Sequence, residues 1–338
     1  MNHFFSPRSI PRRKRGIAAN DSDSDPKTLR KTPSVNKERA ENLLVFGAFV
    51  MLATAFVGGF GFYRSWQRKE LTRIRKDSSI VKTAFGPVEY QVTGKGPVVL
   101  YAHGTPGGYD QGIAFAQFLR GCTVLSPSRP GYLRTPLAAG PAPEEQADLY
   151  AALLDELGIQ QASIIGFSGG GPSALQFALR YPDRCRSLVM IGGIVQRNGK
   201  HERQQALPFW RRLLSQITDR LLVSDPFLYF ALPFTRFIPA GSAVAGMLCS
   251  GALYPLRKAG HENDLIQFAS LEHMPLEQIT APTLVVHGTT DDEVPFDDAM
   301  LLASKLPHVT LLAIEGGDHA AFYTSARTVM PMVRDFLS

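Results

Sequence analysis

The stretch that decides the fold reads Ile164-Ile165-Gly166-Phe167-Ser168-Gly169-Gly170-Gly171-Pro172. A short apolar run ends at a serine between glycines, and a helix-like run follows at once. The pattern G-x-S-x-G needs this strand, turn and helix, because the serine occupies a strained turn and its neighbours must be small where strand and helix pass close together. Such a turn exposes the hydroxyl at a helix N-terminus, where backbone N–H groups favour developing negative charge. The context therefore predicts a nucleophilic serine at Ser168.

Around this stretch, short apolar runs alternate with helical patterns from about residue 80 to the end of the chain. Strands are predicted at residues 88–92, 97–101, 122–125, 163–167, 186–191, 283–286 and 309–314. Helices are predicted at residues 114–119, 172–180, 297–306 and 321–337, and another helix opens at Pro143. Strands that alternate with helices indicate an α/β fold with a mostly parallel sheet and helices on both of its faces.

The alternation stops between residues 192 and 277, where the pattern becomes helical. Apolar residues lie at helical spacing over residues 206–222, and the next stretch contains five aromatic residues: Phe227, Tyr229, Phe230, Phe234 and Phe237. We interpret this segment as an inserted helical cap. Two alternatives remain for its aromatic residues, namely a core packed within the cap or the wall of an apolar substrate pocket.

Charge is distributed unevenly along the 338 residues, whose formal net charge is +6. Residues 1–82 hold 17 Lys and Arg against 7 Asp and Glu, a net of +10, which leaves 19 against 23, a net of −4, for the rest of the chain. Because the main domain is slightly acidic, a nucleic-acid partner is not expected. The hydrophobic content of 44% is sufficient for one large α/β domain with extensions.

The N-terminal segment has three parts. Residues 1–42 are rich in proline, serine and charge and lack an apolar period, which predicts a disordered basic tail. The next run, residues 43–63, begins at Leu43, ends at Tyr63 and contains no charged residue. At 1.5 Å per residue it just crosses a hydrocarbon layer of about 30 Å, and it is longer than the apolar part of a signal peptide. We therefore predict one transmembrane helix at residues 43–63 and a basic juxtamembrane linker at residues 64–82; basic residues at both ends leave its direction open.

Two downstream loops supply the partners that a nucleophilic serine needs. The predicted strand at residues 283–286 leads into a loop that contains Asp291, and the strand at residues 309–314 leads into a loop that contains His319. A serine hydroxyl is a weak nucleophile until a base takes its proton, and that base needs a carboxylate to orient it. The chain order Ser, Asp, His is the one that accompanies a G-x-S-x-G turn.

These motifs together resemble those of the α/β-hydrolase superfamily, over roughly residues 83–338. The matching motifs are His-Gly-x-Pro at residues 103–106, the serine turn at 166–170, Gly-x-x-Asp-x-x-Val-Pro at 288–295 and Gly-x-Asp-His at 316–319. The resemblance implies an esterase- or lipase-like serine hydrolase with an α/β-hydrolase domain at residues 83–338 and a helical cap at residues 192–277.

The resemblance also assigns a role to five residues of this chain. Ser168 is expected to be the nucleophile, His319 the general base and then acid, and Asp291 the orienting carboxylate. The oxyanion hole is expected to use the backbone N–H groups of Thr105 and Gly169, because the proline after Thr105 has no N–H to donate.

Two other carboxylates and two other kinds of site are alternatives to this assignment. Asp292 and Glu293 are the alternatives to the orienting carboxylate, because they follow Asp291 directly. No dinucleotide or P-loop fingerprint is present, and no His or Cys spacing suits a metal, so neither a cofactor nor a metal is expected. Many relatives carry an aspartate after the strand that ends near Ser128 and a bulky residue at the position of Gly169, so we expect a reshaped pocket on the acyl side.

These expectations combine into one functional hypothesis. The chain is predicted to be a single-pass, membrane-anchored serine hydrolase that cleaves an ester-like bond of a small apolar substrate through an acyl-enzyme. An aminopeptidase or an acyltransferase with the same triad is the alternative among enzymes. A non-catalytic membrane scaffold that retains the fold is the alternative of another class, and a complete Ser, His and Asp set argues against it.

Overall fold

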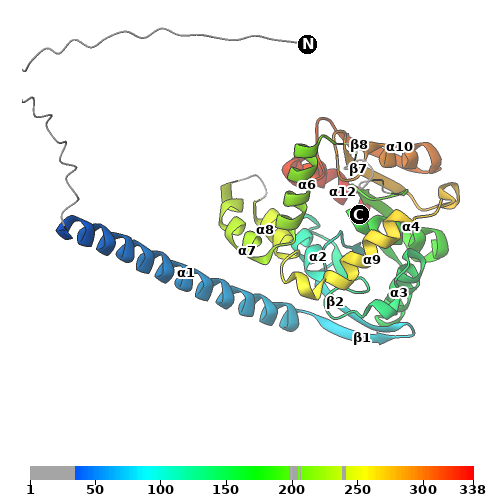
Figure 1. Cartoon of the computed structure of the whole chain (residues 1–338). Helices are drawn as coiled ribbons and strands as arrows, with labels where there is room; N and C mark the ends of the chain where they lie inside the picture. Colours follow the sequence, from blue (N-terminus) through cyan, green and yellow to red (C-terminus); the bar gives the residue numbers. More distant parts are fainter. Residues whose placement is uncertain (1–34, 198, 200–204, 206, 238–240) are drawn as a thin grey trace, which may run out of the picture. The chain divides into compact units, whose positions relative to one another are not determined.

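The computed structural model describes residues 35–197, 199, 205, 207–237 and 241–338, and an eight-stranded sheet forms the centre of this part of the chain (Figure 1). The strand order is β1-β2-β4-β3-β5-β6-β7-β8. Strand β2 pairs antiparallel with β1 and β4, and the other neighbours are parallel. The strand bounds are Ser79–Thr83 (β1), Gly86–Gly94 (β2), Val98–Ala102 (β3), Thr123–Pro127 (β4), Ala162–Phe167 (β5), Cys185–Ile191 (β6), Thr283–Gly288 (β7) and Val309–Ile314 (β8).

Helices cover both faces of the sheet. One core cluster joins the sheet to α3 (Pro143–Glu156), α4 (Gly171–Arg180) and α10 (Phe296–Lys305). A second cluster joins it to α2 (Tyr109–Phe115) and α12 (Ala326–Leu337). Strands β5 and β7 are buried along their whole length, which explains why they read as continuous apolar runs. The predicted α/β fold with a mostly parallel sheet is confirmed.

The structure differs from the sequence-based elements at two helices. The helix predicted at residues 114–119 begins earlier, as α2, and ends in a short 3-10 helix, η1 (Ala116–Phe118). The terminal helix is divided into α11 (Ala321–Thr324) and α12. Both differences concern where a helix begins or breaks, which propensity alone determines poorly.

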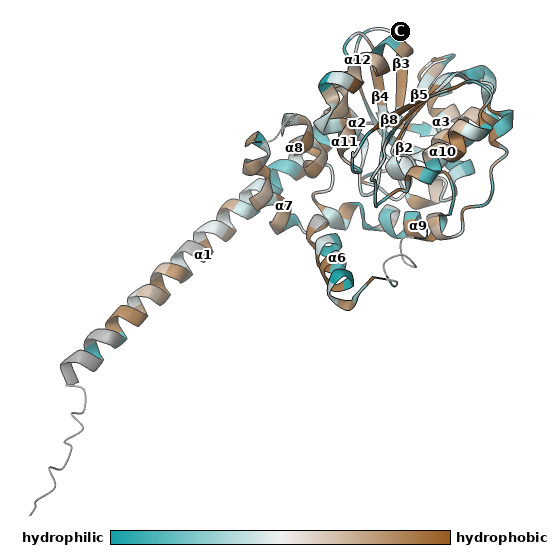
Figure 2. Cartoon of the chain, turned by 90° about the horizontal axis from the view of Figure 1, so that it is seen from above, coloured by the Kyte–Doolittle hydropathy of each residue, from teal (hydrophilic) through white to brown (hydrophobic). Residues whose placement is uncertain are grey.

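The N-terminal helix α1 (Val35–Asp77) is much longer than the predicted span. Among the described residues it is the one helix long and apolar enough to cross a membrane, and much of it is coloured as hydrophobic in Figure 2. Large apolar side chains between Leu43 and Phe62 are exposed. The linker predicted at residues 64–82 consists instead of the last turns of α1 and the edge strand β1. Arg, Lys, Gln and Leu favour helix as strongly as most apolar residues, so a change to charged residues does not end a helix. Buried Ile74 also packs its last turns against Tyr109.

The chain forms two units, Met1–Gly58 and Gly59–Ser338, and the second contains the sheet together with the last turns of α1. Residues 35–42, which were predicted to be disordered, belong to α1. The rest of the predicted tail, residues 1–34, lies outside the described residues, so the expectation for that part stays a prediction.

Helices joined by loops form the described parts of the segment between β6 and β7. Its elements are α6 (Phe209–Leu222), α7 (Asp225–Ala231), η5 (Leu232–Phe237), α8 (Gly241–Cys249), η6 (Tyr254–Leu256), α9 (Lys258–Ala269) and η7 (Leu276–Gln278). The exposed fractions of Phe230, Phe234 and Phe237 are 62%, 67% and 71%. These three rings therefore do not form the packed aromatic core that was one of the two alternatives for the segment.

Candidate active site

Ser168 stands at the carboxyl end of the central strand β5, in the sharp turn that leads into α4. Its φ of 51° lies in the left-handed region, which is strained for a residue with a side chain. The flanking glycines allow the turn. A methyl group at Gly166 would lie 2.7 Å from Cβ of Ala174, and one at Gly170 would overlap the carbonyl oxygen of Ala102. The turn leaves Ser168 half-buried at the start of the helix.

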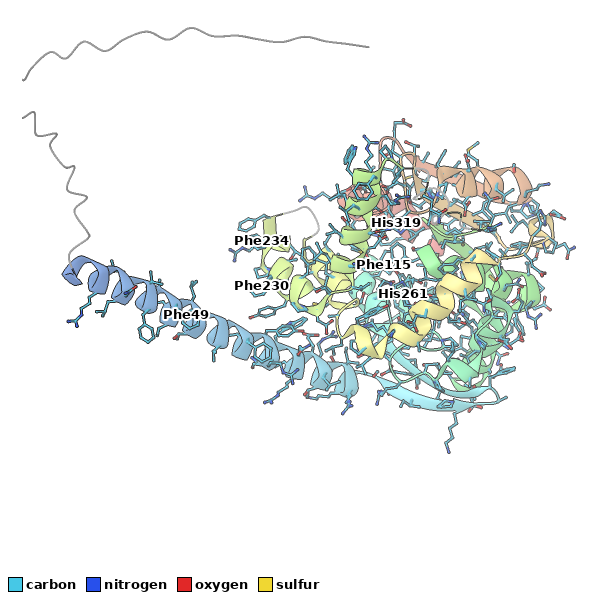
Figure 3. All side chains as sticks on the ribbon, viewed as in Figure 1. Phe49, Phe115, Phe230, Phe234, His261 and His319 are labelled. Atoms are coloured by element: carbon cyan, nitrogen blue, oxygen red, sulfur yellow. The ribbon has the colours of Figure 1, made fainter. Side chains whose placement is uncertain are left out.

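His319, labelled in Figure 3, lies in the loop that follows β8. Its Nε2 is 3.0 Å from Oγ of Ser168, and its Nδ1 is 2.7 Å from Oδ2 of Asp291. Because the carboxylate can only accept, Nδ1 carries the proton in this arrangement and Nε2 is free to accept the serine proton. The ring of Phe167 stacks beside the imidazole, with centroids 5.9 Å apart.

Asp291 lies in the loop after β7 and is buried. Its Oδ1 accepts the backbone N–H groups of Glu293 and Val294, both at 2.9 Å. Its Oδ2 meets His319 and also lies 3.3 Å from Nε2 of His287. Burial by itself would raise the pKa of this carboxyl. Its hydrogen bonds with His287, His319 and the backbone N–H of Val294, together with the electrostatic attraction of His319, outweigh this effect and hold the pKa well below its usual range.

The two alternative carboxylates are placed differently. Asp292 is exposed and Glu293 is half-buried, whereas Oδ2 of Asp291 lies 2.7 Å from Nδ1 of His319. The geometry thus joins Ser168, His319 and Asp291 through two hydrogen bonds.

Thr105 and Gly169 approach each other across the mouth of this site. Thr105 follows β3, and Gly169 is the residue after Ser168. A methyl group on Gly169 would overlap Oγ1 of Thr105 and lie 2.8 Å from Cζ of Phe268 in α9. The backbone N–H of Thr105 donates no hydrogen bond within the described part of the chain. The N–H of Gly169 lies at the start of a helix, where backbone donors lack an intrahelical acceptor.

A buried polar network holds Thr105 in place. Arg129 donates to Asp264 from Nη1 at 2.8 Å and from Nη2 at 2.5 Å, and both side chains are almost fully buried. Oδ2 of Asp264 also accepts the hydroxyl of Tyr132 at 2.5 Å and the hydroxyl of Thr105. Nη2 of Arg129 lies 2.9 Å from Oγ1 of the same threonine. The network therefore fixes the loop after β3 to the loop after β4 and to α9.

His103 connects the same two loops from below. Its Nε2 accepts the backbone N–H of Arg129 at 2.9 Å, and its Nδ1 lies 2.8 Å from the carbonyl oxygen of Gly104. Full burial, and next the charge of Arg129, lower the pKa of His103 well below its usual value of 6.5. The imidazole is therefore neutral, with its proton on Nδ1, and supports the loop that carries Thr105.

The sequence pattern does not reveal the Arg129–Asp264 pair. Arg129 lies in the loop that was compared with relatives, but nothing in the pattern signals its partner, which lies far along the chain in α9. For metals, no group of three His, Cys, Asp or Glu is arranged to hold an ion among the described residues.

Comparison with known proteins identifies the family. Residues 97–228 match the alpha/beta hydrolase fold family. The uncharacterized hydrolase YcgS of Bacillus subtilis is 35% identical over 112 residues, which are 33% of this chain and 39% of that protein. The poly(3-hydroxyalkanoate) depolymerase of Ectopseudomonas oleovorans is 32% identical over 197 residues, 56% of this chain and 66% of the depolymerase. In both cases the chain spans less than two thirds of the relative.

In two other comparisons, the match extends over nearly the whole length of the similar protein. The 2-hydroxy-6-oxononadienedioate/2-hydroxy-6-oxononatrienedioate hydrolase of Burkholderia vietnamiensis is 28% identical over 271 residues, 74% of this chain and 90% of that enzyme. The solved structure of an alpha/beta hydrolase fold protein from Nakamurella multipartita is 32% identical with a TM-score of 0.62, over 77% of this chain and 98% of that one. The chain belongs to the α/β-hydrolase fold family. This α/β-hydrolase carries its serine, acid and histidine loops after β5, β7 and β8, at one edge of the sheet.

Proposed function

We propose that this α/β-hydrolase is a serine hydrolase in which Ser168 attacks a carbonyl carbon. The observation that carries the proposal is the continuous hydrogen-bonded line from Ser168 through His319 to Asp291. As the Oγ–C bond forms, the serine proton passes to Nε2 of His319, and Asp291 stabilises the imidazolium and holds its orientation. The imidazolium then gives this proton to the leaving alkoxide, and a water activated by the same histidine releases the acid and restores the serine.

The tetrahedral intermediate would carry negative charge on the former carbonyl oxygen. We assign the N–H groups of Thr105 and Gly169 to that oxygen, because they lie on two loops that touch at the nucleophile. The start of α4 adds the positive end of a helix dipole at the same place. The Arg129–Asp264 pair then serves to position Thr105 rather than to touch substrate.

An apolar ester is the substrate class that we propose. The side chains next to Ser168 on the cap side form an apolar cluster of Ile194, Phe268 and Val294. The two fully buried guanidinium groups in the described chain, those of Arg129 and Arg257, are each paired with a carboxylate. Neither is therefore available to bind an anionic substrate.

Hydrolysis of a carbon–carbon bond is the second candidate. It is favoured by the similarity to the Burkholderia vietnamiensis hydrolase, which extends over 90% of that enzyme. The substrate in the name of that enzyme is a dicarboxylate, and the pairing of Arg129 and Arg257 with carboxylates weighs against a substrate of this kind here. Comparing esters with such dienedioates as substrates decides between the two.

We further propose that residues 43–63 anchor the enzyme in a membrane as a single span. The support is the absence of charge over this run, its length, and its exposed apolar side chains in α1. The direction of the span is left open by the basic residues on both sides.

A fluorophosphonate probe tests the enzyme proposal on the detergent-solubilised full chain. Labelling of the wild type should vanish in Ser168→Ala and His319→Ala, because the probe reacts only with an activated serine. Ser304→Ala, which removes an exposed serine of α10, is the matched control and should label normally. A folded wild type that does not label in detergent or in lipid would support the scaffold alternative and contradict our proposal. An amine or acyl acceptor series then separates peptidase and acyltransferase activity from ester hydrolysis.

A further inference from the structure

The end of the apolar run is attached to the cap by aromatic contacts. The ring of Tyr63 lies 5.7 Å from the ring of Tyr229 in α7, and the ring of Trp66 lies 5.3 Å from it. Nε2 of Gln67 donates to Oδ2 of Asp225, at the start of α7, over 3.2 Å. Helix α7 is therefore held at the level where the apolar run ends. If that run spans a bilayer, this level is the boundary between lipid and water.

Large aromatic side chains extend outward from this level. Phe230 and Phe234 point away from the body of the hydrolase domain (Figure 3), and Phe237 is 71% exposed. These rings cover neither the sheet nor the active site. We call the exposed apolar side chains of α6, α7 and η5 the aromatic patch; they are Phe209, Trp210, Leu213, Leu214, Ile217, Leu221, Phe227, Phe230, Phe234 and Phe237.

Helix α6 contributes an amphipathic surface to the aromatic patch. Its exposed apolar residues run from Phe209 to Leu221 at positions that share one side of the helix. Arg211 and Arg212 lie off that side, and Arg220 lies at its edge. The guanidinium of Arg211 lies over the ring of Trp210, at 5.1 Å. A helix with aromatic and aliphatic residues on one face and arginines on the other is typical of the surface of a membrane.

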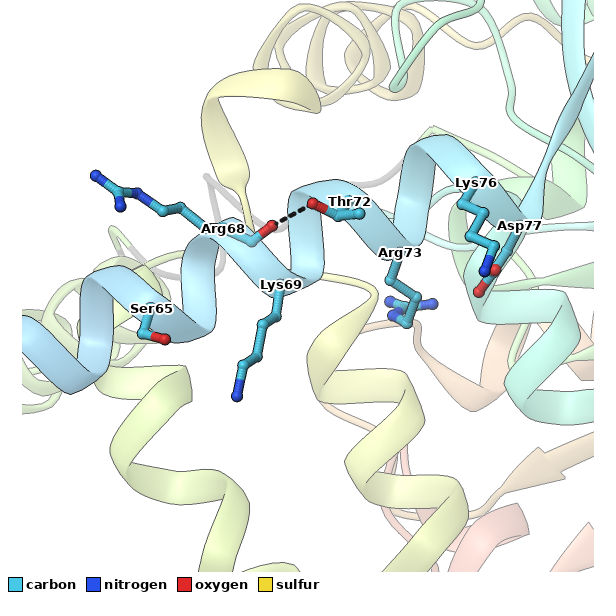
Figure 4. A pocket seen from close by; sticks show the side chains of 7 residues that line it. All are labelled: Ser65, Arg68, Lys69, Thr72, Arg73, Lys76 and Asp77. Atoms are coloured by element: carbon cyan, nitrogen blue, oxygen red, sulfur yellow. Dashed lines mark hydrogen bonds between the residues drawn. The ribbon is translucent and has the colours of Figure 1, made fainter.

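Positive charge surrounds the aromatic patch. The residues from Phe209 to Phe237 hold four arginines and two aspartates, and Arg236 lies over the ring of Phe237 at 4.6 Å. Along α1, from Ser65 onward, a mostly basic surface pocket is lined by Ser65, Arg68, Lys69, Thr72, Arg73, Lys76 and Asp77 (Figure 4). At the end of a membrane span, tyrosine and tryptophan are expected at the level of the lipid headgroups, and arginine and lysine are expected next, toward water. The positive charge of the arginines and lysines complements anionic phospholipids.

We propose that the aromatic patch inserts into the surface of the phospholipid bilayer that holds the anchor. The proposal rests on the membrane anchor proposed above. It adds a second membrane contact, made by the cap itself. The same helical segment carries Asp264 and Phe268 to the active site, so the surface that docks on lipid and the apolar wall beside Ser168 belong to one segment. A substrate dissolved in the bilayer would then meet the cap before it meets water.

Tryptophan fluorescence in lipid nanodiscs tests this docking. The chain contains two tryptophans, Trp66 and Trp210. A Trp66→Phe/Trp210→Phe background of the full chain is dark and keeps an aromatic ring at both positions. Phe230→Trp in this background places one reporter on the patch, and Met300→Trp, on the exposed surface of α10, is the matched control. Discs contain phosphatidylglycerol and phosphatidylcholine, with or without bromine on the acyl chains.

We expect the Phe230→Trp reporter to lose most of its emission in brominated discs and to resist acrylamide, whereas the Met300→Trp reporter should respond only to acrylamide. Quenching of Phe230→Trp by acrylamide alone would show an exposed patch and overturn the inference. Protection from both quenchers would show that protein covers the patch, for example a second copy, and would overturn it as well. Co-elution of the chain with discs at high salt reports the anchor separately. A chain that does not co-elute would refute the anchor together with the docking, while fluorophosphonate labelling remains an independent measure of the triad.

Discussion

Replacing Asp264 by asparagine should destabilise this hydrolase strongly, although Asp264 lies outside the proposed triad. The aspartate is 1% exposed and neutralises Arg129, which is equally buried. Asparagine keeps the shape but removes the charge that balances the guanidinium. Breaking a buried ion pair by removing one partner costs about 3–5 kcal/mol, because an uncompensated charge stays in the interior. For a domain of this size the thermal midpoint should fall by on the order of 10 °C.

The same substitution should slow catalysis. Asp264 and Arg129 both hydrogen-bond the hydroxyl of Thr105, whose N–H we assign to the oxyanion hole. A shift of this loop by about 1 Å would lower kcat about 100-fold, by the usual sensitivity of catalysis to misplacement. The assays are thermal unfolding of the full chain in detergent and hydrolysis of a short-chain ester below the unfolding temperature.

A surface ion pair provides the matched control. Asp148 pairs with Arg180 at 2.8 Å, and the arginine side chain is 43% exposed. Asp148→Asn should cost about 0–1 kcal/mol and leave kcat unchanged, because water replaces the lost partner. Our reasoning would be refuted if Asp264→Asn were no less stable than Asp148→Asn. If Asp264→Asn were unstable but had a normal kcat, the network would support the fold without positioning Thr105.

Three further predictions concern the site itself. Gly169→Ala should lower kcat about 100- to 1,000-fold, the usual cost of losing one oxyanion donor, because the added methyl group overlaps Oγ1 of Thr105. Adding Thr105→Ala to this variant should restore part of the activity. A fully active Gly169→Ala variant would contradict the predicted overlap. Asp291→Asn should lower kcat about 10⁴-fold in the ester assay, because the amide no longer holds the correct tautomer of His319. Asp318→Asn, at an exposed residue, is the control. Similar losses of kcat in both variants would argue against the role assigned to Asp291. Because His103 is neutral when folded and gains a proton below about pH 6.5 when unfolded, stability should fall as pH decreases from about 7 toward the lowered folded pKa, by up to about 1.4 kcal/mol per pH unit. Denaturant titrations of wild type and His103→Gln at several pH values measure this slope, and an equal slope in both proteins would show that His103 takes up protons alike in the folded and unfolded states.

The sequence by itself determined the features that depend on local pattern. The apolar run before Ser168 and the glycines around it predicted the β5 turn, because only small residues fit where strand and helix approach so closely. The alternation of strands and helices predicted the mostly parallel sheet. The absence of charge from residues 43–63 likewise identified a helix that could cross a membrane. Each of these signals is carried by residues close together in the chain.

Only the tertiary structure decided which distant groups meet. Asp291, rather than Asp292, contacts His319, because backbone N–H groups turn one carboxylate inward and leave its neighbour in solvent. The pairing of Arg129 with Asp264 joins residues 135 positions apart and has no local signal. The exposure of rings such as Phe230 also escaped the sequence, since an aromatic run has the same pattern whether it fills a core or faces outward. Burial depends on what packs against a residue, and His319 and Asp264 reach Asp291 and Arg129 from remote parts of the chain.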